Sequence, residues 1–159
     1  MDIYKKYTKK LIQMGEEDQK ILKNSKKINS NIIEIQKNNT EKLKKIIKKM
    51  GYPKPSIVGK KVSMYTWLIV QHSDFDISFQ EEVLNILKTL SEKKEDVKMY
   101  IAYLEDRILI NKHLPQIYGT QAKIKGGKLI PFEIIDMNNV DKRRKRMGLD
   151  KLENYLKSQ

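Results

Sequence analysis

The sequence predicts a mostly α-helical, single-domain bundle of about seven helices with one small β-hairpin near residues 120–132. Apolar residues recur at three- and four-residue intervals along most of the chain, which is typical of amphipathic helices. Gly126-Gly127 suits the positive dihedral angles of a tight hairpin turn. The 159 residues, 39% of them hydrophobic, suffice for one core. We therefore predict one domain over residues 1–159, in which a long N-terminal helix within residues 1–27 can pack loosely on the rest.

The first fifty residues predict three helical segments. An amphipathic helix spans Ile3 to Asn24, and a second apolar stripe covers Ile28 to Ile35. Asn38-Asn39-Thr40 supplies side chains that cap helix N-termini. We therefore expect a new helix to begin there and to end at Gly51.

A rigid connector, Tyr52-Pro53-Lys54-Pro55, precedes the central part of the chain. The next segment begins at Ser56 or Gly59 and runs to residues 71–72. Its middle is apolar on nearly all sides, as in a helix buried in the core. Asp74 or Asp76 is then expected to cap a helix over residues 78–90.

The last third of the chain predicts a further helix, the hairpin and two short helices. The helix begins near Glu95 and is ended by Pro115. Residues 120–124 and 128–132 form the two strands. Asn139-Val140-Asp141 caps a short helix that ends at Gly148, and Asp150 caps the final one.

The basic charge is concentrated near the N-terminus. The formal net charge is +13, and residues 1–50 carry 14 lysines against 6 acidic residues. Lysines at helical spacing form either a solvated helix face or a surface for nucleic-acid phosphates. The densest basic run consists of Lys142, Arg143, Arg144, Lys145 and Arg146. It could also contact phosphates, but no aromatic residue is interleaved with it to stack on bases.

Composition excludes several classes of function. The chain has no cysteine, which rules out disulfide frameworks, thiolate zinc sites and cysteine nucleophiles. No apolar run approaches the ~18 residues that cross a bilayer, so we expect no membrane partner. The first residues lack the apolar core of a secretion signal, so a cytoplasmic location is expected. The oligomeric state is left open.

Polar residues at the end of the central helix mark the first candidate site. Gln71, His72 and Asp74 follow an apolar run at the mouth of the predicted core, where each polar group needs a partner. The alternative is structural: His72 ends one helix, and Asp74 or Asp76 caps the next.

Two further polar clusters lie downstream. Asp106 and Arg107 belong to an otherwise apolar helix, where they either face a site or form an internal bridge. Gln116, Tyr118, Thr120 and Gln121 surround Gly119 in a loop rich in hydrogen-bonding groups. Such a loop either satisfies itself as a turn or orients a ligand.

These three blocks resemble the signature of a bacterial domain family of unknown function. Its members often have Gln-His-Ala-Asp, Asp-Arg-Val and Tyr-Gly-Thr-Gln at similar spacing. The resemblance covers most of residues 15–156, including Asp18-Gln19, Gly51-Tyr52-Pro53 and residues 140–149. Ser73, Tyr52 and Leu22 stand where alanine, tryptophan and arginine are common. The resemblance implies a common site, to which Asp18 and Gln19 can contribute, and no settled activity.

Together these residues suggest acid–base chemistry on a small anionic molecule. We expect His72 as the catalytic base, Asp106 or Asp74 as the carboxylate that orients it, and Arg107 as the cation for an anionic group. The other expected ligand-binding residues are Gln71, Gln116, Tyr118, Thr120, Gln121, Asp18 and Gln19. A metal-independent hydrolase, lyase or transferase acting on an anionic metabolite, a nucleotide or a modified side chain fits this set.

Other functions stay open at this point. A non-catalytic module could hold an anionic ligand or partner in the same pocket. Nucleic-acid binding or cleavage could use the lysine-rich N-terminal helices and residues 142–146. We expect no cofactor, although His72, Asp74 and Asp76 offer three ligands for a divalent cation within five residues.

Overall fold

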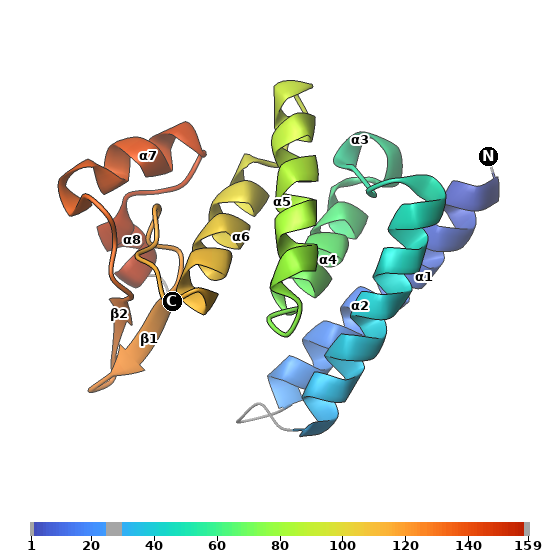
Figure 1. Cartoon of the computed structure of the whole chain (residues 1–159), viewed down its shortest axis with the longest axis horizontal. Helices are drawn as coiled ribbons and strands as arrows, with labels where there is room; N and C mark the ends of the chain where they lie inside the picture. The colour runs from blue at the N-terminus through green and yellow to red at the C-terminus, as the bar shows by residue number, and fades with distance from the viewer. Residues whose placement is uncertain (1, 25–29, 158–159) are drawn as a thin grey trace.

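The computed structural model describes residues 2–24 and 30–157, and it confirms a mostly helical single domain with one hairpin. Figure 1 shows the chain passing from two long helices at one end of the molecule to the hairpin and two short helices at the other. The described residues form eight α-helices and one 3₁₀ helix, against about seven helices expected.

The element bounds agree with most of the sequence-based expectations. The helices are α1 (Asp2–Asn24), α2 (Ser30–Met50), α3 (Pro55–Val58), α4 (Lys60–Gln71), α5 (Ile77–Glu92), α6 (Lys98–Asn111), α7 (Val140–Arg146) and α8 (Leu152–Lys157). Strands β1 (Ala122–Lys125) and β2 (Lys128–Pro131) pair antiparallel, and the 3₁₀ helix η1 covers Met137–Asn139. Over the described ranges, no helix combines the length and apolarity needed to cross a membrane.

The bounds of helix α2 differ from those predicted from the sequence. The expected helix start at Asn38-Asn39-Thr40 is wrong, because α2 runs unbroken from Ser30 to Met50. Asn39 and Thr40 are buried within it, and Thr40 Oγ1 donates to the carbonyl of Gln36 one turn earlier. Packing against neighbouring helices has overridden the local capping preference. Ile28 lies outside the described residues.

Aspartate side chains accept hydrogen bonds from the backbone N–H groups at two helix N-termini. Asp76 caps α5 by accepting from the Phe79 N–H at 3.1 Å, as one of the two predicted alternatives. The cap predicted for the last helix is wrong: Asp141 of α7, rather than Asp150, accepts from the Leu152 N–H at 2.8 Å. The carbonyl of Asp150 instead accepts from Arg144. A residue eleven positions away in sequence thus replaces the local cap, because α7 and α8 pack together.

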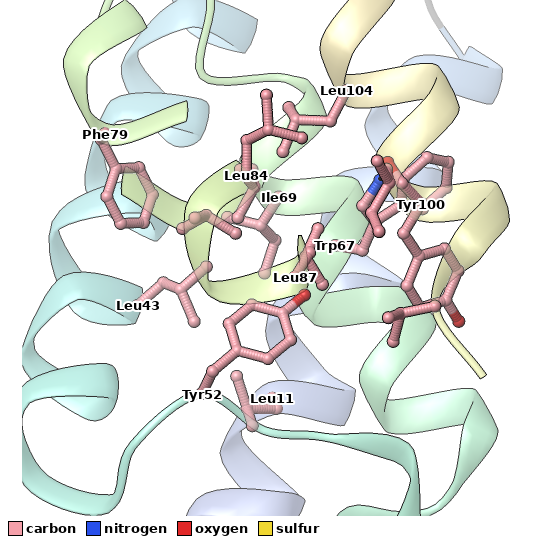
Figure 2. Packing of buried hydrophobic residues seen from close by; sticks show 14 of the residues in the cluster. Leu11, Leu43, Tyr52, Trp67, Ile69, Phe79, Leu84, Leu87, Tyr100 and Leu104 are labelled. Atoms are coloured by element: carbon pink, nitrogen blue, oxygen red, sulfur yellow. The ribbon is translucent and has the colours of Figure 1, made fainter. Parts of the chain in front are cut away.

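Helix α4 is the centre of the core, as predicted, and it packs against α1, α2, α5 and α6. Trp67 of α4 stacks on Tyr100 of α6 with ring centroids 4.9 Å apart, and its Nε1 donates to the Tyr100 carbonyl at 3.1 Å. Figure 2 shows Leu11 of α1 and Leu43 of α2 in the same cluster. The long N-terminal helix therefore contributes to the main core.

Helices α1 and α4 approach each other closely at Gly15. A Cβ built on Gly15 would lie 2.3 Å from Cγ of Tyr65, which is closer than real atoms come. The glycine lets α1 lie directly against α4. Asp18, one turn further along α1, is thereby brought beside the C-terminal end of α4.

Candidate functional site

The turn that follows α4 places His72 against α1. His72 is the C-cap residue of α4, and its Nδ1 lies 2.8 Å from Oδ2 of Asp18. The Asp18 side chain is only 2% exposed, whereas the imidazole is 18% exposed. Gln19 Nε2 donates to the same Asp18 oxygen at 3.2 Å. Asp18 therefore orients the imidazole, in the place that the sequence analysis had assigned to Asp74 or Asp106.

The neighbours of His72 in this turn are buried. Ser73 Oγ donates to the Ile69 carbonyl at 2.7 Å and lies 2.7 Å from Thr40 Oγ1 of α2. Gln71 is 5% exposed, and its Oε1 has no hydrogen-bond partner among the described residues. The turn is thus held between α1 and α2, which restricts the positions that His72 can adopt.

Asp74 forms a bidentate ion pair with Arg107 of α6. Arg107 donates from Nε to Oδ1 at 2.9 Å and from Nη2 to Oδ2 at 2.6 Å, and Asn111 donates to Oδ1 at 2.8 Å. Burial alone would raise the pKa of Asp74, but the Arg107 guanidinium and the Asn111 amide outweigh it and hold the pKa below its usual value. Arg107 also donates from Nη1 to Gln121 Oε1 at 3.4 Å. Of the two alternatives for Asp106 and Arg107, the internal bridge between them is therefore not formed.

The three side chains considered for a divalent cation point to different partners. His72 contacts Asp18, Asp74 contacts Arg107, and Asp76 contacts Lys44 while it caps α5. Within the part of the chain that the structure describes, no group of three His, Cys, Asp or Glu side chains is placed to hold a metal ion.

Asp106 holds the loop that follows α6. Its carboxylate is fully buried and accepts from the backbone N–H groups of Ile117, Tyr118 and Thr120 at 2.7–3.0 Å, and from Thr120 Oγ1 at 2.9 Å. Burial raises the pKa of Asp106, although these donors oppose the shift. Because four donors bind its buried carboxylate, Asp106 organises the loop. It does not orient His72, whose partner is Asp18.

Gln116 connects this loop to the hairpin. Its Nε2 donates to the carbonyls of Gln121 and Phe132 at 2.8 and 3.0 Å, and its Oε1 accepts from the Gln121 N–H at 2.9 Å. Tyr118 OH donates to Glu105 of α6 at 3.2 Å. The amide of Gln116 is fully used within the fold, whereas Gln121 presents its own side chain to Arg107.

The basic run is only partly available to a partner. Arg144 is 1% exposed, donates to the carbonyls of Tyr118 and Asp150, and lies over the Tyr155 ring. Arg143 donates to the carbonyls of Ile117, Ile135 and Asp136. Lys142, Lys145 and Arg146 are exposed. Two of the five residues therefore bind the loop and the C-terminal region of the chain itself.

A surface hollow borders Gln19, the residue that donates a hydrogen bond to Asp18. It has a volume of about 340 Å³ and is lined by Glu16, Gln19, Lys20 and Lys23 of α1 and by Tyr65 of α4. Gln19 belongs both to its lining and to the hydrogen bonds of Asp18. Of these five residues, only Gln19 is among the site residues expected from the sequence.

A model for a family of unknown function (DUF6624) matches residues 7–159. The chain belongs to this family. No curated protein and no solved structure matches the chain. The family resemblance drawn from the sequence is thus confirmed, and a family of unknown function assigns no activity.

In this DUF6624 chain the three signature blocks meet around α4 and α6. The Gln-His-x-Asp block is the turn after α4, the Asp-Arg block lies on α6, and the Tyr-Gly-Thr-Gln block folds over Asp106. Asp74, Arg107 and Gln121 connect all three blocks by hydrogen bonds. His72 is bonded neither to Asp106 nor to Arg107, and its partner is on α1.

One signal in the sequence could have indicated this pairing. Leu11, Met14 and Asp18 follow one another at helical spacing, so a carboxylate continues the buried stripe of the first helix. A buried carboxylate needs a partner, and the histidine at the end of the central helix is one.

Proposed function

We propose that this protein is an acid–base enzyme that acts on a small anionic molecule, with His72 as the general base or acid. The observation that carries the proposal is the hydrogen bond of 2.8 Å between His72 Nδ1 and the buried Asp18. A carboxylate on Nδ1 selects the tautomer that leaves Nε2 to exchange a proton. Among the described residues nothing bonds Nε2.

The hollow lined by Gln19, Lys20 and Lys23 supports an anionic substrate. Lys20 and Lys23, one turn apart on α1, bring two positive charges to the lining against the one carboxylate of Glu16, and Gln19 connects the hollow to Asp18, the partner of His72. Arg107, the cation expected from the sequence, is neutralised by Asp74 and therefore offers less to a ligand. A volume of about 340 Å³ suits a metabolite or a nucleotide.

The test is a turnover screen of the full chain against phosphomonoesters, carboxylic acids and nucleotides, followed by mass spectrometry. A substrate found in this way should be turned over about 10²–10⁴-fold more slowly by His72→Gln and also more slowly by Asp18→Asn. His113→Asn is the matched control, because His113 is exposed and lies in the loop after α6. Turnover that is equal in wild type and His72→Gln would contradict the proposal.

One observation favours a second candidate, a module that binds an anionic ligand without reaction. The side chains of His72, Ser73 and Asp74 each tie the turn to a different helix, which is also the arrangement of a purely structural turn. Stoichiometric binding that depends on Lys20 and Lys23, with the ligand recovered unchanged, would favour this candidate over the enzyme.

A further inference from the structure

We infer that the outward faces of α1 and α2 form a binding surface for the phosphate backbone of a nucleic acid. The surface, called here the lysine ridge, consists of Lys5, Lys6, Lys9 and Lys10 on α1 and Lys42, Lys45, Lys48 and Lys49 on α2. This inference does not depend on the proposed acid–base function.

The fold brings the two halves of the ridge to the same end of the molecule. Helices α1 and α2 pack side by side and run in opposite directions, so the beginning of α1 lies next to the end of α2 (Figure 1). Their inner faces bury Leu11, Met14, Leu43 and Ile46 in one cluster. Seven of the eight lysines are exposed and Lys42 is half-buried, so their ammonium groups are directed away from that core.

The charge of the ridge is not neutralised within the described residues. None of the eight lysines forms an ion pair with a side chain of residues 3–23 or 30–157. In contrast, the lysines of the adjoining segment have acidic partners: Lys54 pairs with Glu95, Lys60 with Asp96 and Lys61 with Glu16. Like charges held close together repel one another, and a polyanion relieves this repulsion while it releases its own counterions.

The chemistry of the ridge favours phosphates in a nucleic acid over a lipid surface. A helix that lies on a membrane inserts apolar side chains among its lysines. Over residues 5–10 and 42–50, every fully exposed side chain is a lysine, while Tyr7, Ile47 and Met50 pack against the core. The exposed apolar residues Ile3 and Tyr4 precede the ridge. The second basic run is less available, because Arg143 and Arg144 bind backbone carbonyls.

The experiment measures binding of the full chain to a fluorescent DNA duplex of mixed sequence and to a single-stranded RNA by anisotropy. If about six phosphates are contacted, affinity for the duplex should fall about 10³-fold between 50 and 200 mM salt. A variant with Lys6, Lys9, Lys45 and Lys49 changed to Gln should bind at least about tenfold more weakly and show a smaller salt slope. Binding of either nucleic acid supports the inference. The ratio of the two dissociation constants shows whether DNA or RNA is preferred.

The matched control removes four charges from the opposite end of the molecule by changing Lys125, Lys128, Lys145 and Lys151 to Gln. These lysines are also exposed, and the control has the same net charge as the ridge variant. Equal weakening by both variants would overturn the inference, because net charge alone would then explain binding. Salt-insensitive binding by the wild type, or tighter binding to polyglutamate or to phosphatidylserine vesicles, would also overturn it. Circular dichroism verifies that both variants are folded.

Discussion

The Nδ1 atom of His72 lies 2.8 Å from Oδ2 of Asp18, a residue 54 positions earlier in the sequence. Asp18 is buried between α1 and α4, so this hydrogen bond joins the first helix to the turn that ends the central one. Because the same contact can serve both catalysis and stability, variants at either residue need a thermal unfolding measurement beside every activity measurement. A loss of turnover with an unchanged Tm supports the catalytic role.

Replacing Asp106 by Asn should destabilise the fold. The buried carboxylate accepts four hydrogen bonds, and an asparagine would direct an NH₂ group at some of these donors. We expect a loss of about 2–4 kcal/mol in the free energy of unfolding. Urea unfolding measures it. Glu105→Gln is the control, because Glu105 lies on the same helix and is partly exposed, and it should change stability by less than about 1 kcal/mol. An Asp106→Asn protein as stable as the wild type would disprove the organising role.

Replacing Arg144 by Lys should destabilise the C-terminal region although the charge is kept. The guanidinium reaches two carbonyls, those of Tyr118 and Asp150, and stacks on Tyr155, which an ammonium group cannot do at once. We expect a loss of about 2–4 kcal/mol, measured by chemical unfolding. The exposed Arg146, changed to Lys, is the control and should leave stability unaltered. If Arg146→Lys were the more harmful change, Arg144 would not have its assigned role.

The contribution of Asp74 to stability should depend on pH. Burial tends to raise the pKa of Asp74, but Arg107 and Asn111 hold it below its ordinary value. A carboxyl with a lowered folded-state pKa contributes stability above its unfolded pKa of about 4, and this contribution is lost as the pH falls through the folded-state pKa. The difference in unfolding free energy between the wild type and Asp74→Asn should therefore be largest at neutral pH and should shrink as the pH falls. Urea titrations at successive pH values measure this difference. Asp150→Asn, at an exposed site, is the control and should show no such trend. If the difference between the wild type and Asp74→Asn grew as the pH fell, the lowered pKa assigned to Asp74 would be refuted.

Replacing Gly15 by Ala should lower the Tm. Alanine ordinarily stabilises a helix interior by about 1 kcal/mol relative to glycine. Here the added Cβ would meet Cγ of Tyr65 at 2.3 Å and Cβ of Tyr65 at 2.4 Å, so α1 and α4 would have to separate. Gln13→Ala on the exposed side of α1 is the control and should leave the Tm nearly unchanged. A rise in Tm for Gly15→Ala would show that the two helices can separate without cost.

Most predictions that rest on short-range patterns agree with the structure. Apolar periodicity located the central helix α4, the Gly126-Gly127 pair located the hairpin, and Gly51 ends α2 with a φ of 76°. The failures occur where a local signal competes with packing. Asn38-Asn39-Thr40 has the composition of a helix start, but burial of Asn39 and Thr40 keeps α2 continuous. Capping preferences amount to about 1 kcal/mol, which the burial of a helix face exceeds.

The candidate site shows the same contrast between what local patterns predict and what tertiary packing decides. The sequence indicated that His72, Asp74, Asp106, Arg107 and Gln121 need hydrogen-bond partners, because they are polar groups in apolar surroundings. It could not assign the partners, since neither the 54 positions between Asp18 and His72 nor the 33 between Asp74 and Arg107 produce a periodic pattern.

By itself, then, the sequence determined the helices, the hairpin and the polar residues that require satisfaction, since backbone propensity and the burial of apolar side chains act over a few residues. Only the tertiary structure decided that Asp18 orients His72 and that Arg144 is turned inward. It also decided that two lysine-rich helices lie side by side at one end of the molecule (Figure 1). The reason is that these relationships depend on which helices pack together, and pairing between distant segments is set by the whole core and by no single stretch of chain.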